Sequence, residues 1–197
     1  MKQKLAYAVR VVSIPPVMVS LLILVLAVFA EGVFGSGLEI AAMLFFLALI
    51  PLLAYPLSWL IPGVRRKGRE GQRNLAFLLT GAGYVLGWFY GKFFSGNREQ
   101  ILVYTIYLIS LLLLLLWNKV FRLRASGHAC SVTGPTVLAG WYLGLVGIIV
   151  GAVCYLLIFW ASVTTKRHKP DEFLGGSVLC FAACGIAWLL CQYFTVF

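Results

Sequence analysis

The apolar segment 129–165 constrains this chain most, because each of its flanks carries one of the two histidines. His128 precedes it, within the basic stretch NKVFRLRASGHACS (118–131), and His168 follows it, within TKRHKPDE (165–172). A single helix of these 37 residues would hold the two histidines at opposite ends of a rod about 55 Å long. A hairpin of two short helices would instead bring the two histidines back to one place.

The composition of the chain indicates the environment of this segment. Of the 197 residues, 62% are hydrophobic and only 11% are charged, and the mean hydropathy is +0.97, which is typical of an integral membrane protein. The 16 Lys and Arg residues outnumber the 6 acidic residues, but they lie almost entirely between apolar runs. We interpret them as topology signals and as contacts for lipid headgroups or phosphate. The expected partner is therefore the lipid bilayer and not nucleic acid.

The apolar runs predict an all-α transmembrane bundle. The first run follows a basic start, is long enough to span a bilayer, and has no small-residue cleavage site after it, so we expect an uncleaved first helix. Pro51 and Pro56 should bend the second helix, and the dense basic stretch 65–73 should form a loop after it. We expect spans at roughly 11–30, 38–61, 75–94, 101–117 and 172–195, with two shorter helices inside 129–165.

The distribution of charge favours the hairpin in 129–165. Two crossings of a core about 30 Å thick need about 40 residues, so this segment suffices if its helices are short. Gly140, Gly144 and Gly147 offer turn positions near its middle. With a hairpin and a cytoplasmic N-terminus, all of the 16 Lys and Arg residues except Lys92 and Arg98 face the cytoplasm. The prediction is a polytopic bundle of six to seven helices in the cell membrane, forming a single domain 1–197 with its active site at the cytoplasmic membrane edge.

The two basic segments together offer the groups that phosphoryl transfer through histidine requires. One neutral imidazole must attack phosphorus, a second must protonate the leaving oxygen, and fixed cations or N–H groups must surround the other oxygens. His168 and His128 supply the imidazoles. The cations within reach are Lys119, Arg122, Arg124 and Arg167.

The same residues resemble two sequence motifs of the type 2 phosphatidic acid phosphatase superfamily, a family of membrane lipid phosphate phosphatases. Its second motif, Pro-Ser-Gly-His, is similar to Ser126-Gly127-His128 with Ala125 where Pro is usual. Its third motif is Ser-Arg, five residues, His, three residues and Asp. His168 matches the histidine of this motif, Glu172 falls on its acid, and Asp171 lies one position short. The resemblance covers 101–197, the phosphatase-like core, whereas the helices of 1–94 diverge.

The resemblance implies roles for these residues. His168 would be the nucleophile, His128 the general acid, and Glu172 or Asp171 the acid that orients the nucleophile. Ser126 and Gly127 would contact the phosphate. Family members need no metal and no cofactor, and the chain contains no metal-ligand spacing that would suggest one.

The chain departs from the family pattern at the arginines. Ser162 stands where the third motif has its phosphate-binding arginine, and no residue in 155–165 is cationic. The first motif, a Lys with Arg-Pro seven to eight residues later, is compressed here to Lys119, Arg122 and Arg124. Arg66 and Arg73 have the right separation but lie two spans earlier and lack the proline.

Two hypotheses of function follow from the sequence. The first is a metal-independent phosphatase that hydrolyses a membrane lipid phosphate or diphosphate, such as phosphatidate, phosphatidylglycerol phosphate or a polyprenyl (di)phosphate, through a phosphohistidine. The alternative is a non-catalytic protein that binds or transports anionic lipid with the same cations, which the serine at 162 favours. A channel is disfavoured because no charged residue falls in the middle of an expected span. The sequence makes no prediction about oligomeric state.

Overall fold

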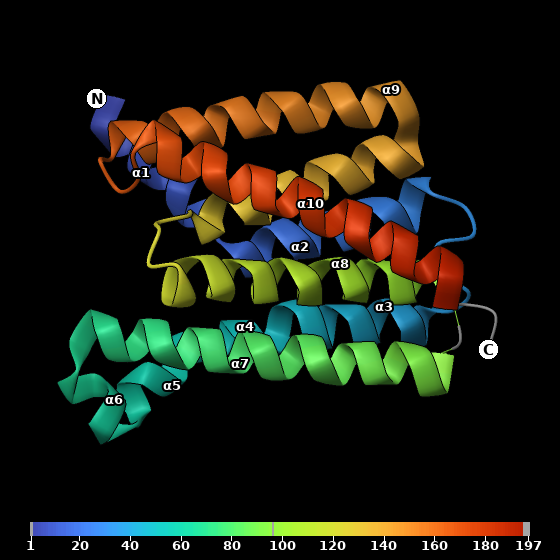
Figure 1. Cartoon of the computed structure of the whole chain (residues 1–197), viewed down its shortest axis with the longest axis horizontal. Coiled ribbons are helices and arrows are strands. Elements are labelled where there is room, and N and C mark those ends of the chain that lie inside the picture. The colour runs from blue at the N-terminus through green and yellow to red at the C-terminus, as the bar shows by residue number, and fades with distance from the viewer. Residues whose placement is uncertain (1, 96, 195–197) are drawn as a thin grey trace.

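The computed structural model describes residues 2–95 and 97–194, and its regular structure is entirely helical within those ranges (Figure 1). Four of its helices are long and apolar enough to cross a membrane, or five if the bent pair at the N-terminus is one span. This agrees with an all-α integral membrane protein, although the expected count of six to seven helices is not confirmed. The end of the expected span 172–195 lies outside the described residues.

The first expected span is broken into two helices. α1 covers Lys2–Val12, α2 covers Pro15–Phe29, and their axes differ by 64°. The break falls at Ser13 and Ile14 because the proline that follows disfavours helical backbone at Ile14, which is extended with φ −63° and ψ 150°. The helix that we expected over 11–30 therefore begins at Pro15, and the basic N-terminus forms a helix of its own.

The second expected span is not one regular α-helix. It consists of α3 (Gly37–Leu44), a π-helical turn (Phe45–Leu49), α4 (Ile50–Leu52) and α5 (Ala54–Leu60). The basic stretch 65–73 is helical and not a loop, because it forms the end of α6 (Pro62–Arg66) and the first turns of α7 (Gly68–Tyr90). Gly68, with φ +55°, makes the turn between these two helices.

The segment 129–165 doubles back on itself, as the charge distribution predicted. It lies within α9 (Gly127–Thr164), whose helical geometry is interrupted at Gly144 with φ 62° and ψ −140°. The two arms run antiparallel in Figure 1, and the Thr136 hydroxyl of one arm donates to the Gly151 carbonyl of the other at 3.2 Å. Only glycine adopts such a backbone readily, and Gly144 therefore sets the turn.

α8 (Arg98–Leu115) is the central helix of the bundle. It packs mainly against α10 (Pro170–Phe194) and α7, while α10 also packs against α9. Tyr104 of α8 is fully buried against the α7 side, where Gly87 makes room for it. A Cβ atom at Gly87 would lie 2.5 Å from the Tyr104 ring, so close packing of α7 on α8 depends on that glycine.

The basic segments gather at one end of the bundle. Figure 1 shows α1, α6, the loop that follows α8 and the link between α9 and α10 at that end, whereas the turn of the α9 hairpin lies at the other. A π-helical turn (Leu116–Val120) extends α8 toward the basic loop. This arrangement brings the two histidine segments together.

Candidate functional site

The two histidines line one cavity. His128 lies in the first turn of α9, and His168 lies in the link between α9 and α10. Both contact a cavity of about 310 Å³ that is bounded by α1, α7, α8, α9 and α10. Its deeper wall is mostly apolar and includes Ile106, Leu111 and Leu114 of α8. The cavity is therefore polar at the histidine end and apolar between the helices.

A second cavity of about 560 Å³ adjoins the first and carries most of the cations. Arg73, Gly127 and His168 line both cavities. The other polar residues that line the second cavity are Asn118, Lys119, Arg124, Arg167 and Glu172. An anion held between the two cavities would therefore meet positive charge and an imidazole ring together.

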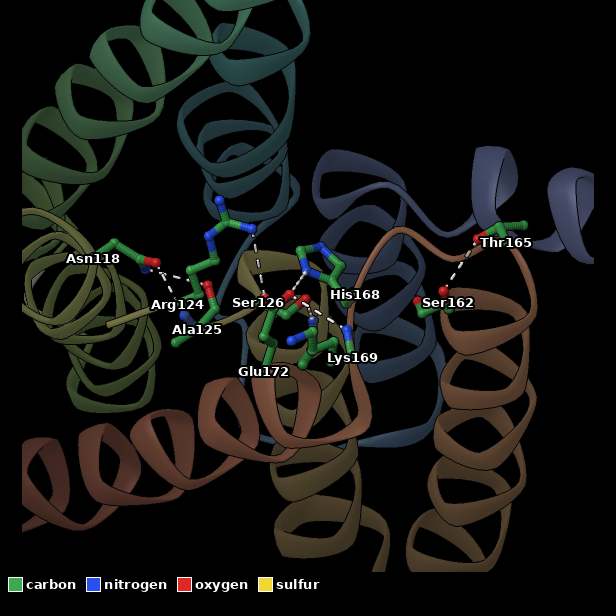
Figure 2. A network of polar contacts seen from close by, with 10 residues as sticks. Asn118, Arg124, Ala125, Ser126, Ser162, Thr165, His168, Lys169 and Glu172 are labelled. Atoms are coloured by element: carbon green, nitrogen blue, oxygen red, sulfur yellow. Dashed lines mark hydrogen bonds and ion pairs between the residues drawn. The ribbon is translucent and has the colours of Figure 1, made fainter. Parts of the chain in front are cut away.

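Glu172 holds the ring of His168. The Nδ1 atom of His168 lies 3.2 Å from the Oε2 atom of Glu172, which is four residues later in the first turn of α10 (Figure 2). A carboxylate only accepts hydrogen bonds, so in the neutral ring Nδ1 carries the proton and Nε2 keeps its lone pair. Figure 2 also shows Arg124 reaching toward the same carboxylate, at 3.9 Å from Oε1, although its side chain is 86% exposed. The geometry fixes the tautomer that a nucleophilic imidazole needs.

The loop before α9 is fixed by backbone contacts. The N–H of Ser126 donates to the carbonyl of Glu172 at 2.9 Å, which joins the segment of His128 to that of His168. Asn118 holds the neighbouring Ala125 from both sides, accepting from its N–H at 3.0 Å and donating to its carbonyl at 3.2 Å. Gly176 of α10 packs so closely that a Cβ atom there would lie 2.2 Å from the Ser126 carbonyl oxygen.

The ring of His128 has a partner that sequence reasoning missed. Its Nε2 atom lies 2.9 Å from the Oγ atom of Ser13, a buried residue in the break between α1 and α2. The proline pair that follows Ser13 predicts a helix break, but nothing in the sequence links that break to a residue more than 100 positions later.

Two arginines of the N-terminal half also lie at the site. Arg10 of α1 and Arg73 of α7 line the cavity that contains both histidines. The sequence indicates for both arginines a topology signal or a contact for lipid headgroups or phosphate, and it places Arg73 in a basic loop. One feature of the sequence sets Arg10 apart, because it is the only charged residue between Lys4 and Glu31.

Three predicted site residues lie away from both cavities. Ser126 is fully buried, and its hydroxyl caps α9 by accepting from the N–H of Ala129 at 3.2 Å. Arg122 is exposed and has a left-handed backbone with φ 55°. Asp171 is exposed in the first turn of α10, and no hydrogen bond or ion pair of its side chain occurs among the described residues. Of the two acids considered as partners of His168, the structure brings Glu172 to the ring and not Asp171.

Ser162 is also removed from the cavities. It is 0% exposed near the end of α9, and its hydroxyl oxygen has no hydrogen-bond partner among the described residues. Figure 2 shows it beside Thr165, away from the group formed by His168 and Glu172. Its carbonyl accepts from Thr165 and from the N–H of Arg167, which shapes the link before His168.

Within residues 2–95 and 97–194, no three His, Cys, Asp or Glu side chains come together in a way that would hold a metal ion. In comparisons with known proteins, no family model, no curated protein and no solved structure matches this chain significantly. The function must therefore be argued from the geometry of the two cavities.

Proposed function

We propose that this chain is a metal-independent membrane phosphatase that hydrolyses a lipid phosphate or diphosphate, as its resemblance to the type 2 phosphatidic acid phosphatases implies. One observation carries the proposal. The two histidines line a common cavity although 129–165 separates them, and a carboxylate holds one ring in the tautomer of a nucleophile.

The reaction follows from these positions. Nε2 of His168 attacks phosphorus and the bond between phosphorus and the lipid oxygen breaks. His128 enters this step as the imidazolium, a form that the charge of the bound phosphate favours, and gives one proton to that oxygen to become the neutral imidazole. Water then attacks the phosphohistidine, His128 takes a proton from the water, and the bond from phosphorus to His168 breaks to release phosphate. Glu172 stabilises the positive charge that develops on the His168 ring.

The surroundings of the histidines suit an amphiphilic substrate. Lys119, Arg124 and Arg167 line the adjoining cavity and would attract a phosphate group. The apolar wall formed by α7 and α8 would accept the start of a lipid tail. Phosphatidate, phosphatidylglycerol phosphate and polyprenyl (di)phosphates all combine these two features.

The proposal includes a location for the site. The end of the bundle that holds α1, α6 and the histidine segments would face the cytoplasm, because most Lys and Arg residues belong to those elements. The two arms of α9 would then cross separately, and α7, with 23 residues, would cross as well. This arrangement gives six to seven crossings in the cell membrane.

The direct test is release of inorganic phosphate from these lipids by the full chain in detergent, with EDTA present. His168→Ala should abolish release, whereas the neighbouring exposed Lys169→Ala should retain it. Phosphate release that survives His168→Ala would refute the mechanism.

One observation favours the alternative, a non-catalytic protein that binds or transports anionic lipid. The family arginine is replaced by Ser162, which is buried and lines neither cavity. The alternative predicts lipid binding without phosphate release. Lipid binding should then survive His168→Ala and should be lost when Lys119 and Arg124 are neutralised.

A further inference from the structure

We propose that Arg10 of α1 and Arg73 of α7 form the phosphate-binding clamp of this site and take over the role of the arginine that Ser162 replaces. The identification of the anion as phosphate rests on the proposed function. That the site binds an anion does not rest on the proposed function, because it follows from the positions of the charged side chains.

Arg10 has a buried donor without an acceptor. Its Nε atom is inaccessible to solvent and has no hydrogen-bond partner among the described residues, although the side chain lines the cavity of the two histidines. A buried N–H without a partner is costly, and such groups in proteins usually have a ligand or a structural acceptor. Arg10 lies in the last turn of α1, where a helix end would offer carbonyl acceptors, but its Nε uses none of them.

The charges around Arg10 are not balanced. Arg69 and Arg167 lie close enough to Arg10 to repel it electrostatically. Within the described ranges, Glu172 pairs with Arg124 and also holds the ring of His168 by a hydrogen bond. The carboxylate that lines the second cavity, Glu172, is therefore already engaged, and a cluster of cations around a cavity attracts an anion from outside the protein.

The position of the two arginines suits a phosphate group. Arg73 lines both cavities, and Arg10 lines the one that holds the histidines. A phosphate in reach of both imidazoles would therefore meet a guanidinium fork from α1 and another from α7. Each fork can donate two parallel hydrogen bonds to phosphate oxygens, which a lysine cannot do.

The environment of Ser162 explains why the arginine lies elsewhere. Its side chain is fully enclosed, so an arginine at this position would have to bury its charged head among helix side chains. In this fold, the helices of 1–94 supply the cations that this part of α9 does not.

The test measures anion binding and turnover separately, in the full chain purified in detergent. Binding of orthovanadate is followed through the rise that it causes in the melting temperature. Arg10→Gln and Arg73→Gln should each weaken vanadate binding about tenfold or more, because each removes charge-assisted hydrogen bonds. Lys4→Gln on α1 and Lys67→Gln just before α7 remove exposed charges near the two arginines in the chain and should leave binding unchanged.

The melting temperature without vanadate separates a ligand role from a structural one. If Arg10 awaits an anion, Arg10→Gln relieves repulsion and should leave the empty protein equally stable or more stable. Arg10→Lys, which keeps the charge but not the fork, should give intermediate binding. Vanadate binding by Arg10→Gln that equals that of the natural chain, or a fall in the stability of the empty Arg10→Gln protein, would overturn the clamp.

The two proposals fail in different ways. Vanadate binding that depends on Arg10 and Arg73, without phosphate release from any lipid, supports the clamp and refutes the phosphatase. Phosphate release that depends on His168 but not on Arg10 or Arg73 supports the phosphatase and refutes the clamp.

Discussion

The Nε2 atom of His128 lies 2.9 Å from the Oγ atom of Ser13, although 115 positions separate the two residues in the chain. Ser13 is 4% exposed and lies where α1 ends and Pro15 begins α2. The helix break therefore places a hydroxyl group against the ring of the proposed general acid. Through this contact, the N-terminal segment orients His128, although the segment itself lies outside the part of the chain that resembles the phosphatase motifs.

Ser13→Ala should lower the kcat for phosphate release about 2- to 10-fold with little change in KM. The reason is that one hydrogen bond, worth about 0.5–1.5 kcal/mol, no longer orients His128. The matched control is Ser20→Ala, because the Ser20 hydroxyl donates to the Pro16 carbonyl within α2 and lies outside both cavities. An equal loss of kcat in both variants would show that Ser13 has no specific effect on the histidine.

Glu172→Gln should lower kcat by about 10²- to 10⁴-fold, since a neutral amide neither fixes the His168 tautomer nor stabilises the charged ring. Asp171→Asn should change kcat by less than about 3-fold, because Asp171 is exposed and its side chain forms no described contact with His168. Steady-state phosphate release by the two variants compares the acids directly. A larger loss of kcat in Asp171→Asn than in Glu172→Gln would mean that Asp171, and not Glu172, orients His168.

The positions of the two histidines could be predicted because hydrophobicity and charge act over long segments. If 129–165 is buried in lipid and the cations on both of its flanks stay on one side of the membrane, the segment must form a hairpin. The backbone turns at Gly144. The contact between His168 and Glu172 follows from their separation of four residues, because His168 lies just before α10 and Glu172 lies in the first turn of that helix.

The contribution of the N-terminal helices could not be predicted, because it depends on tertiary packing. Whether Arg10 marks topology or lines a cavity depends on the angle between α1 and α2, and no local pattern gives that angle. Ser126 was expected at the site and lies outside both cavities. Its place in a motif predicts a phosphate contact, whereas the chain uses its hydroxyl to cap α9 and buries it completely.

Adjacent glycines at the start of α10 should respond differently to alanine. A Cβ atom at Gly176 would lie 2.2 Å from the Ser126 carbonyl oxygen, whereas one at Gly175 would meet no atom within 4 Å. Gly176→Ala must therefore push α10 away from the loop and strain the hydrogen bond from Ser126 to Glu172. We expect a loss of about 1–3 kcal/mol in the free energy of unfolding, measured by denaturant titration, together with reduced phosphate release.

Gly175→Ala is the matched control and should change the free energy of unfolding by less than about 0.5 kcal/mol. Its added methyl group faces open space, and alanine favours a helix over glycine. If Gly176→Ala were tolerated as well as Gly175→Ala, the close contact between α10 and the loop of Ser126 would not govern the site.

The hairpin of α9 should depend on Gly147 as well as on Gly144. A Cβ atom at Gly147 would lie 2.0 Å from the Ala139 carbonyl oxygen in the opposite arm, so Gly147→Ala must spread the arms. Because His128 and His168 lie at the far ends of these arms, spreading separates the two rings and should reduce phosphate release and melting temperature together. Gly185→Ala in α10, where an added Cβ would meet no atom within 4 Å, should change neither quantity. Full activity in a Gly147→Ala protein with a lowered melting temperature would mean that catalysis does not need the two imidazoles in a common cavity.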